Sequence, residues 1–383
     1  MAGITGNRST ATVLQAQRKV DMAERVLLLE PSSYPLTVLL RMLQKKSAHN
    51  PEFSWIEKAL EPRFAAVSGA QTNVDTAIEV AAAQGVRFAP HYLVKNTRTA
   101  EVFRVVSVAT DTLTVVRGVG GGNLAMNDTD ELIVIGVAQP EGDDIRPARS
   151  NNGVKVTNYT QIFRTPFGAT ETNRHSDTFT EPSDWEQAAL EAGIEHEKDK
   201  EYVFWLGKPS EDLTAPANPR RTTGGVEYFA NQNITDAGGA FTETEMFTAF
   251  RAPFRYSGQN RVAFGSMLIV DIMNTFPRGK VQTQQGETTY GLQVFKYISP
   301  HGTVRLITHK LFEGAVYGGK MAILDMDQLK YRYLANKEGS RDTHIERNRQ
   351  GPGVDGRIDE YLTEAGLQCA LPQAHGWVAN ATS

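Results

Sequence analysis

Apolar residues are sparse up to Val20 and then gather in two short runs, RVLLLEP at 25–31 and YPLTVLLRML at 34–43. Pro31 and Pro35 interrupt these runs, so a single long helix is not expected there. Segments this short cannot bury their own apolar side chains. We therefore predict an extended N-terminal arm whose apolar anchoring points lie across a neighbouring chain.

A β-rich region follows the arm, where short β-branched segments are separated by turn residues. They predict strands at 102–108, 112–118 and 131–138. The GVGGGN segment that begins at Gly118 is typical of a flexible turn. We expect a small antiparallel β unit, preceded by an irregular segment at 68–77. Its boundary is placed near residue 153, where the composition becomes polar.

Two helices have recognisable start signals. Ser183 with Glu186, and Thr242 with Glu245, have the spacing of a capping box. The first helix is predicted over 183–206. It is acidic for most of its length and apolar at its end, so we expect one exposed and one buried end. The second helix places four apolar side chains on one face, at Met246, Phe247, Phe250 and Phe254.

The rest of the chain predicts one long loop and several strands. Pro, Gly and Asn residues predict the loop over 208–240. A hairpin is expected where SPHG joins two apolar segments. Strand patterns are present at 261–270, 292–298, 303–311 and 321–334, and as a last strand pair around Pro372.

The composition is that of an ordinary globular chain, and its length suggests two or three domains. Among 383 residues, 40 basic and 44 acidic side chains give a net charge of −4. This charge excludes a protein whose overall field attracts nucleic acid or anionic membrane. The single Cys369 excludes an internal disulfide. No apolar run approaches the ~20 residues of a membrane helix, and we expect no secretion signal.

The charge is unevenly distributed along the chain. Residues 1–46 contain seven basic and three acidic side chains, a net charge of +4. The rest of the chain is correspondingly more acidic, so any basic surface is expected on the arm.

Catalytic and metal-binding patterns are weak. His196 lies among carboxylates at 195–201, but Lys200 stands where a zinc helix needs a second His, so we interpret the run as a solvated helical face. There is no GxSxG motif. Cys369 is interpreted as a buried strand residue, and Asp325 and Asp327 as solvated or capping side chains. We predict a protein that is not an enzyme, with no catalytic, cofactor-binding or metal-binding residues.

Five segments in chain order resemble the major capsid protein of tailed bacteriophages, with the fold named after phage Hong Kong 97. They are NPEFSWIEKALEPR (50–63), VVSVATDTLTVVRGVGGG (105–122), VTNYTQIFRTPFGATET (156–172), EYVFWLGK (201–208), and TVRLITHKLF (303–312) followed by MAILDMDQLKYRYL (321–334).

The resemblance implies an α+β fold of the Hong Kong 97 type, with a spine helix at 183–206. It implies four parts: an N-terminal arm at 1–49, an extended loop region with an inserted β unit at 50–160, a peripheral domain at 161–234 and 301–383, and an axial domain at 235–300.

The implied function is a major capsid protein that self-assembles into hexamers and pentamers. These would form the icosahedral head shell around phage double-stranded DNA, without a cofactor. Its partners would be other copies of itself, the portal, separate scaffolding and decoration proteins, and DNA through weak non-specific contacts, but no membrane. It would be made in the cytoplasm of a bacterial host and reside in the virion capsid. Deleting residues 1–46 is expected to leave soluble capsomers that fail to form stable shells.

Two sets of arm residues are the candidate functional residues. The intersubunit anchors are expected at Leu27, Leu28, Leu29, Leu36, Leu39 and Leu40. Basic residues facing the lumen or DNA are expected at Arg8, Arg18, Lys19, Lys45 and Lys46. Alternatively, these basic side chains only pair with acidic neighbours, such as the 181–201 helix. The alternative functions are a decoration or tail-tube protein and a hydrolase with an unrecognised site within 235–335.

Overall fold

The chain forms two compact units in the computed structural model, and each is described by itself. One unit spans Ile56–Lys155 and the other comprises the chain on both sides of it. The described residues are 34–43, 45–59, 62–142, 152–176, 183–214, 218–256, 258, 260–276, 283–285, 294–299, 301–337 and 339–382.

The inserted unit is a six-stranded antiparallel sheet. The strands run in the order β3 (Phe64–Ala66), β8 (Glu131–Val137), β5 (Tyr92–Asn96), β6 (Val102–Ala109), β7 (Thr112–Val116) and β4 (Ala77–Glu79). The 3₁₀ turn η2 (Gly85–Arg87) precedes β5. An isolated bridge between Val67 and Val80 joins the ends of β3 and β4, so the sheet closes on itself. The strands predicted at 102–108, 112–118 and 131–138 are confirmed as β6, β7 and β8.

The interior of the closed sheet is apolar, with one buried ion pair beside it. Phe103, Val105 and Leu113 are fully buried there. Arg117 donates two hydrogen bonds, of 2.9 and 2.6 Å, to the two carboxylate oxygens of Glu101. The same guanidinium donates to the carbonyl oxygens of Thr72 and Leu124, which ties the irregular segments on either side to the sheet.

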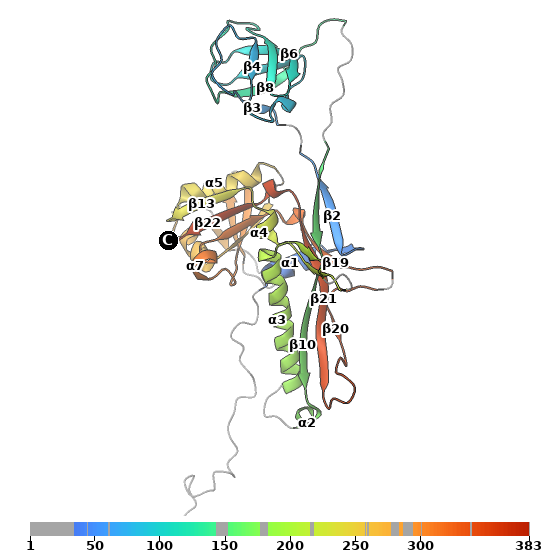
Figure 1. The fold of residues 1–383 in the computed structure, drawn as a ribbon. Coiled ribbons are helices and arrows are strands. Elements are labelled where there is room, and N and C mark those ends of the chain that lie inside the picture. The colour runs from blue at the N-terminus through green and yellow to red at the C-terminus, as the bar shows by residue number, and fades with distance from the viewer. Residues whose placement is uncertain are drawn as a thin grey trace, which may run out of the picture. The chain divides into compact units, whose positions relative to one another are not determined.

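The other unit contains a mainly antiparallel sheet that carries the long helix. Its strands are β1 (Lys45–Ala48), β19 (Leu329–Leu334), β21 (Arg357–Cys369) and β10 (Gln161–Ala169), in that order, and β20 (His344–Glu346) also pairs with β21. The helix α3 (Asp184–Leu206) runs alongside β10 and β21 (Figure 1). The chain also forms the short helix α2 (Glu171–Arg174), and β2 (Glu52–Glu57) pairs with β9 (Val154–Tyr159) in a two-stranded sheet.

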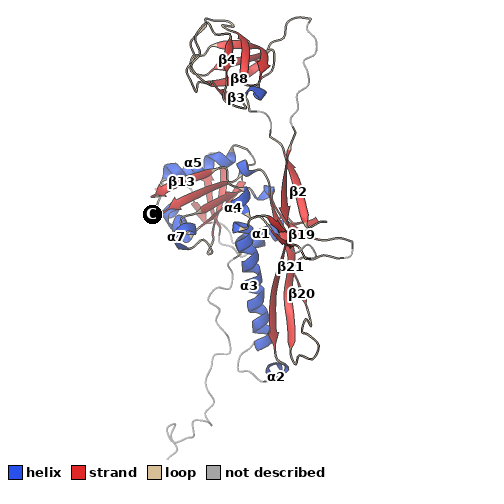
Figure 2. Cartoon of the chain, viewed as in Figure 1, coloured by secondary structure: helices blue, strands red, loops and turns tan. Residues whose placement is uncertain are grey.

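A seven-stranded sheet, to the left of α3 in Figure 2, is the other large sheet of this unit. Its order is β13 (Ile234–Gly239), β22 (Gly376–Ala381), β18 (Met321–Leu324), β14 (Asn260–Gly265), β17 (Gly302–Thr308), β16 (Val294–Ser299) and β15 (Thr283–Gln285). The remaining elements are α1 (Pro35–Leu43), α4 (Val226–Phe229), α5 (Glu243–Phe254), α6 (Met267–Thr275), α7 (Gly314–Tyr317), β11 (Ser210–Asp212), β12 (Arg220–Thr222), η3 (Met326–Gln328) and η4 (Pro372–Ala374).

Alternating side chains bury both faces of this sheet. Met321 and Ile323 of β18 belong to a core that includes residues of α5 and α6. Ala322 and Leu324 of the same strand point to the other face, into a core that includes Trp205 of α3. Because successive strand residues point to opposite faces, the continuous apolar run in β18 is explained by burial on both sides.

The helix predictions are confirmed in position, but one start signal is not used. The helix predicted over 183–206 is α3, yet Ser183 makes no side-chain capping hydrogen bond. The Thr242–Glu245 capping box at the start of α5 is complete. On the predicted apolar face of α5, Met246 and Phe250 are buried, whereas Phe247 is 43% exposed.

Several predictions in the C-terminal half need correction. The strand predicted at 261–270 ends at Gly265, where Ser266 caps α6 by accepting a hydrogen bond from the Ile269 N–H. The predicted loop at 208–240 contains β11, β12, α4 and β13. The segment 321–334 divides into β18 and β19, which lie in different sheets, as do the two strands around Pro372. The hairpin predicted through SPHG is confirmed as β16 and β17.

The expected boundary between an axial and a peripheral domain at residue 300 falls inside the seven-stranded sheet. β17, β18 and β22 lie after that boundary, but they belong to the same sheet as β14. A division by sheets therefore places these three strands with the segment that precedes residue 300.

Candidate functional site

A row of polar side chains is buried on the inner side of α3. His196, Lys200 and Glu201 are each no more than 1% exposed. Helical spacing brings residues three to five apart onto one side of the helix, which here faces the sheet and α1. The interpretation of residues 195–201 as a solvated face is therefore wrong for these three side chains.

The Glu201 carboxylate caps the N-terminus of α1 from a distant part of the chain. Its oxygens accept hydrogen bonds from the Leu36 N–H at 3.0 Å and the Thr37 N–H at 2.7 Å. The Thr37 hydroxyl also donates to it at 2.6 Å. The first amides of a helix have no partner within the helix, and a negative charge near them is favourable. Pro35 suits the first position of α1 because it has no N–H to satisfy.

Two more side chains converge on the same carboxylate. The Trp205 indole N–H donates to Oε1 at 3.0 Å, and His309 Nε2 lies 2.7 Å from that oxygen. Trp205 and His309 also meet edge to face, with ring centroids 5.3 Å apart. Glu201 thus joins α1, α3 and the loop after β17 in one buried cluster, which we call the arm-docking site.

Ion pairs extend the arm-docking site along α1 and β1. Arg41 donates to Glu197 at 3.0 Å, and Lys200 donates to the same oxygen at 2.6 Å. Lys45 of β1 forms an ion pair with Asp342, which also accepts a hydrogen bond from the Tyr331 hydroxyl. These contacts attach α1 and β1 to the rest of their own subunit.

Burial changes the titration of several groups at this site. It lowers the pKa of His196 to about 3, although Thr165 and Thr363 lie within hydrogen-bond distance of its ring nitrogens. Burial also lowers the pKa of Lys200 to about 8, against the opposing influence of Glu197. The pKa of the Tyr331 hydroxyl is raised, first by burial and then by Asp342.

The predicted intersubunit anchors divide into two groups. Leu36, Leu39 and Leu40 are 0%, 7% and 0% exposed in the core of their own chain. The expectation that they contact a neighbouring subunit is therefore corrected, because α1 uses this apolar face internally. Leu27, Leu28 and Leu29 lie outside the described residues.

Among the predicted basic residues, two can be placed. Lys45 pairs with Asp342, and its ammonium lies 4.9 Å from the centre of the Tyr333 ring. Lys46 is exposed. Arg8, Arg18 and Lys19 lie outside the described residues.

The remaining sequence candidates have structural partners. Cys369 is buried in β21, as predicted. Asp325 caps η3 by accepting from the Asp327 N–H, as expected for a capping residue. In the described part of the chain, no three His, Cys, Asp or Glu side chains are grouped so that they could hold a metal ion. No described helix is long and apolar enough to cross a membrane.

Sequence reasoning missed Glu201, Glu197, Lys200 and His309. Their partners are up to 165 positions away in the sequence, between Leu36 and Glu201. The signal available was the position of Glu201 immediately before the apolar segment YVFWL, where an exposed carboxylate is out of place.

The sequence resembles those of known capsid proteins along most of its length. The model of the SU10 major capsid protein family matches residues 4–382. A major capsid protein of Pseudomonas phage PaMx41 is 28% identical over 310 residues, covering 73% of this chain and 72% of that protein.

Solved structures show the same fold at low sequence identity. One from Mycobacterium phage Bobi has a TM-score of 0.51 at 10% identity, covering 98% of this chain and 99% of that chain. The capsid of an empty GTA particle has a TM-score of 0.50 at 9% identity and covers 98% of both chains. Since the family model matches nearly the whole sequence, the chain belongs to the SU10 major capsid protein family, and its α+β fold is of the Hong Kong 97 type.

Proposed function

We propose that this major capsid protein self-assembles as hexamers and pentamers into the icosahedral head shell of a tailed bacteriophage, around double-stranded DNA. The observation that carries the proposal is the family match over residues 4–382, together with a Hong Kong 97-type fold. A shell of identical chains needs each copy to bury surface against several others under closed symmetry. The virion is its place of action, and the cytoplasm of a bacterial host its place of synthesis.

The elements of the chain suggest which parts perform this task. The sheet that contains β10 and β21, with α3 along it, is assigned to the peripheral domain. The seven-stranded sheet with α5 and α6 is assigned to the axial domain, which meets other copies around the five- and six-fold axes. Residues 1–33 are assigned to the arm, and the inserted unit with the β2–β9 pair to the extended loop.

The proposed role needs neither catalysis nor a cofactor. The arm-docking site is consistent with this, because the side chains of Glu201, Lys200 and His309 are engaged in hydrogen bonds or ion pairs within the subunit. The proposed partners are other copies of the chain, the portal, and separate scaffolding and decoration proteins. A net charge of −4 favours weak, non-specific contact with packaged DNA over tight binding.

Electron microscopy of the purified full-length chain at increasing concentration tests the proposal. Closed shells of uniform size, or rings of five and six subunits, are the expected result. A chain that stays monomeric or dimeric at high concentration contradicts the proposal, and hollow tubes would instead indicate a tail-tube protein.

A further inference from the structure

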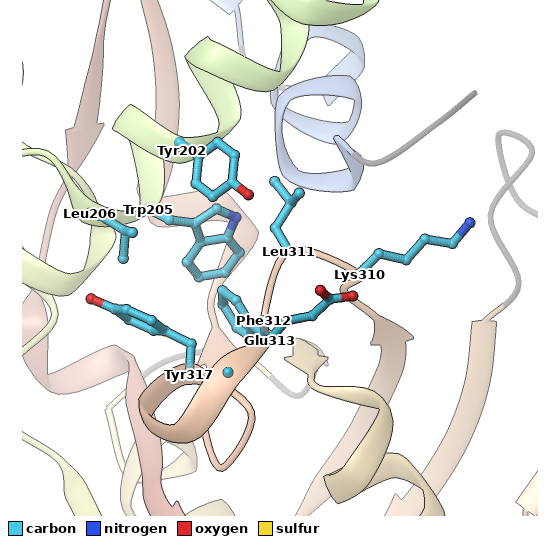
Figure 3. A pocket seen from close by; sticks show the side chains of 9 residues that line it. Tyr202, Trp205, Leu206, Lys310, Leu311, Phe312, Glu313 and Tyr317 are labelled. Atoms are coloured by element: carbon cyan, nitrogen blue, oxygen red, sulfur yellow. The ribbon is translucent and has the colours of Figure 1, made fainter. Parts of the chain in front are cut away.

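A hollow of about 450 Å³, with aromatic, aliphatic and charged side chains in its walls, opens between the end of α3 and the loop that leads into α7 (Figure 3). Its walls are formed by Tyr202, Trp205 and Leu206 on one side and by Leu311, Phe312 and Tyr317 on the other. Tyr202 is 45% exposed, although it lies in the apolar end of the helix. An exposed hollow lined with aromatic and aliphatic side chains is typical of a binding surface.

The hollow lies directly beside the place where the described chain begins. The Leu36 N–H and the Trp205 indole N–H are each 3.0 Å from the same oxygen of Glu201. His309, which contacts that oxygen too, is two residues before Leu311. The start of α1 and the wall of the hollow are thus held together by one buried carboxylate.

The sequence immediately before α1 has the composition to fill this hollow. Val26, Leu27, Leu28 and Leu29 form the strongest apolar run among residues 1–33. Leu29 is five positions and Leu27 seven positions before Tyr34, and a chain of that length spans up to about 17–25 Å. We propose that Val26–Leu29 of the same chain dock in this hollow and continue the attachment of the arm beyond α1.

Charges at the hollow complement those that flank the apolar run. Lys310 and Glu313 line the hollow, and both are exposed. In the arm, Arg25 precedes the apolar run and Glu30 follows it, on the side nearer α1. Lys310 is next to His309 and so lies on the side of the hollow nearer α1. In the proposed arrangement Lys310 therefore forms an ion pair with Glu30, and Glu313 forms one with Arg25.

This inference concerns attachment within one subunit and does not depend on the proposed shell. It assigns Leu27–Leu29 a site on their own chain in place of the intersubunit contact expected from the sequence. In one case the leucines dock on their own chain, and in the other they dock on a neighbouring chain. A covalent link between engineered cysteines shows which of the two occurs.

The test combines Leu28→Cys with Tyr202→Cys in the full-length chain. Under mild oxidation we expect a disulfide within one chain, seen as faster migration without reducing agent and as a linked peptide by mass spectrometry. The matched control is Leu28→Cys with Leu190→Cys. Leu190 is 47% exposed on the same helix, about 18 Å further along it. Absence of the 28–202 link, equal linking in the control, or a link that joins two chains overturns the proposal.

A charge exchange provides a second, independent test. An arginine-specific protease cuts after Arg25, and docking should slow this cut. Lys310→Glu should accelerate it about two- to fivefold, the range expected for loss of one exposed ion pair, and Glu30→Lys combined with Lys310→Glu should restore the slower rate. Lys337→Glu, an equal charge change at an exposed position elsewhere, is the control. An unchanged rate in Lys310→Glu, or no recovery in the double variant, contradicts the proposed pairing.

Discussion

Glu201 shows how one carboxylate can hold three elements together. It receives hydrogen bonds from two amides of α1, the indole of α3 and a hydroxyl, and it contacts the imidazole after β17. A buried carboxylate is tolerated where its oxygens are fully satisfied by donors. Removing it would leave those donors buried and unpaired, so its importance exceeds that of a surface ion pair.

We therefore predict that Glu201→Ala lowers the free energy of unfolding by about 3–5 kcal/mol, as expected when one partner of a buried charged cluster is removed. Urea denaturation of the soluble subunit measures this change. Glu191→Ala on the same helix is the control, because Glu191 is exposed and its carboxylate accepts one hydrogen bond from Gln187. Equal losses in the two variants would contradict the role assigned to Glu201.

Two buried histidines predict sensitivity to mild acid. Burial lowers the pKa of His196 to about 3 and that of His375 to about 4, whereas an unfolded histidine has a pKa of about 6.5. The unfolded chain therefore binds these protons first as the pH falls. The free energy of unfolding is therefore highest above pH 6.5. It falls as the pH drops toward the lowered pKa values of the folded state, by about 2 kcal/mol per histidine at pH 5.

The histidine variant His196→Gln isolates one of these contributions. It should reduce the change in the unfolding free energy between pH 6 and pH 5 by about 1.2 kcal/mol. Urea denaturation at pH 7, 6 and 5 measures the slope, and the parent protein is the reference. An unchanged slope would show that His196 is not the group that titrates on unfolding.

At the scale of single elements, the same sequence signal has two different outcomes. The side chains at the start of α5 form a complete capping box, whereas Ser183 at the start of α3 makes no capping hydrogen bond. Thr242→Ala should therefore lower the free energy of unfolding by about 1 kcal/mol. Ser183→Ala should change it by less than about 0.5 kcal/mol. Paired urea titrations compare the two, and equal costs would contradict the geometry at Ser183.

Local patterns predicted the elements well where neighbouring residues alone determine them. The alternating strands β6, β7 and β8 and the extent of α3 follow from spacing and turn residues. The run RVAFGSMLIV at 261–270 predicts one strand because both halves are apolar. It changes to helix at Ser266, a capping residue preceded by Gly265, and this was the available signal.

Long-range pairings could not be predicted from local patterns. The division of 321–334 between two sheets depends on β14 and β22 for β18, and on β1 and β21 for β19. The arm-docking site likewise depends on residues brought together by the whole fold. For this reason His196, Lys200 and Glu201 were assigned to solvent by sequence and lie in the core.

At the scale of the whole molecule, the structure changes where the N-terminal arm ends, from the expected residue 49 to residue 33. Residues 1–33 can be removed without loss of α1 and β1, whereas removing 1–46 deletes α1 and half of β1. Leu36, Leu39 and Leu40 would then be lost from the core, at about 1.5–3 kcal/mol each. That sum is comparable with the total stability of a typical domain, about 5–15 kcal/mol.

Deletion of residues 1–33 should therefore leave a folded, soluble subunit that keeps α1 and β1. Deletion of 1–46 should instead give a poorly soluble or unfolded chain, which replaces the expectation from sequence that it yields soluble capsomers. Thermal unfolding by circular dichroism and electron microscopy of both variants measure the two effects. Equal stability of the two truncated chains would contradict the assignment of α1 to the subunit core.

The closed sheet of the inserted unit limits aggregation between copies of that unit. Open strand edges act as templates on which other chains add strands, and this leads to aggregation. Within residues 62–142, the Val67–Val80 bridge joins the two outermost strands to each other. In the proposed shell, many copies of this unit stand close together throughout the life of the particle. Such copies can contact one another through side chains, but their closed sheets offer few unpaired backbone groups to which another copy could add a strand.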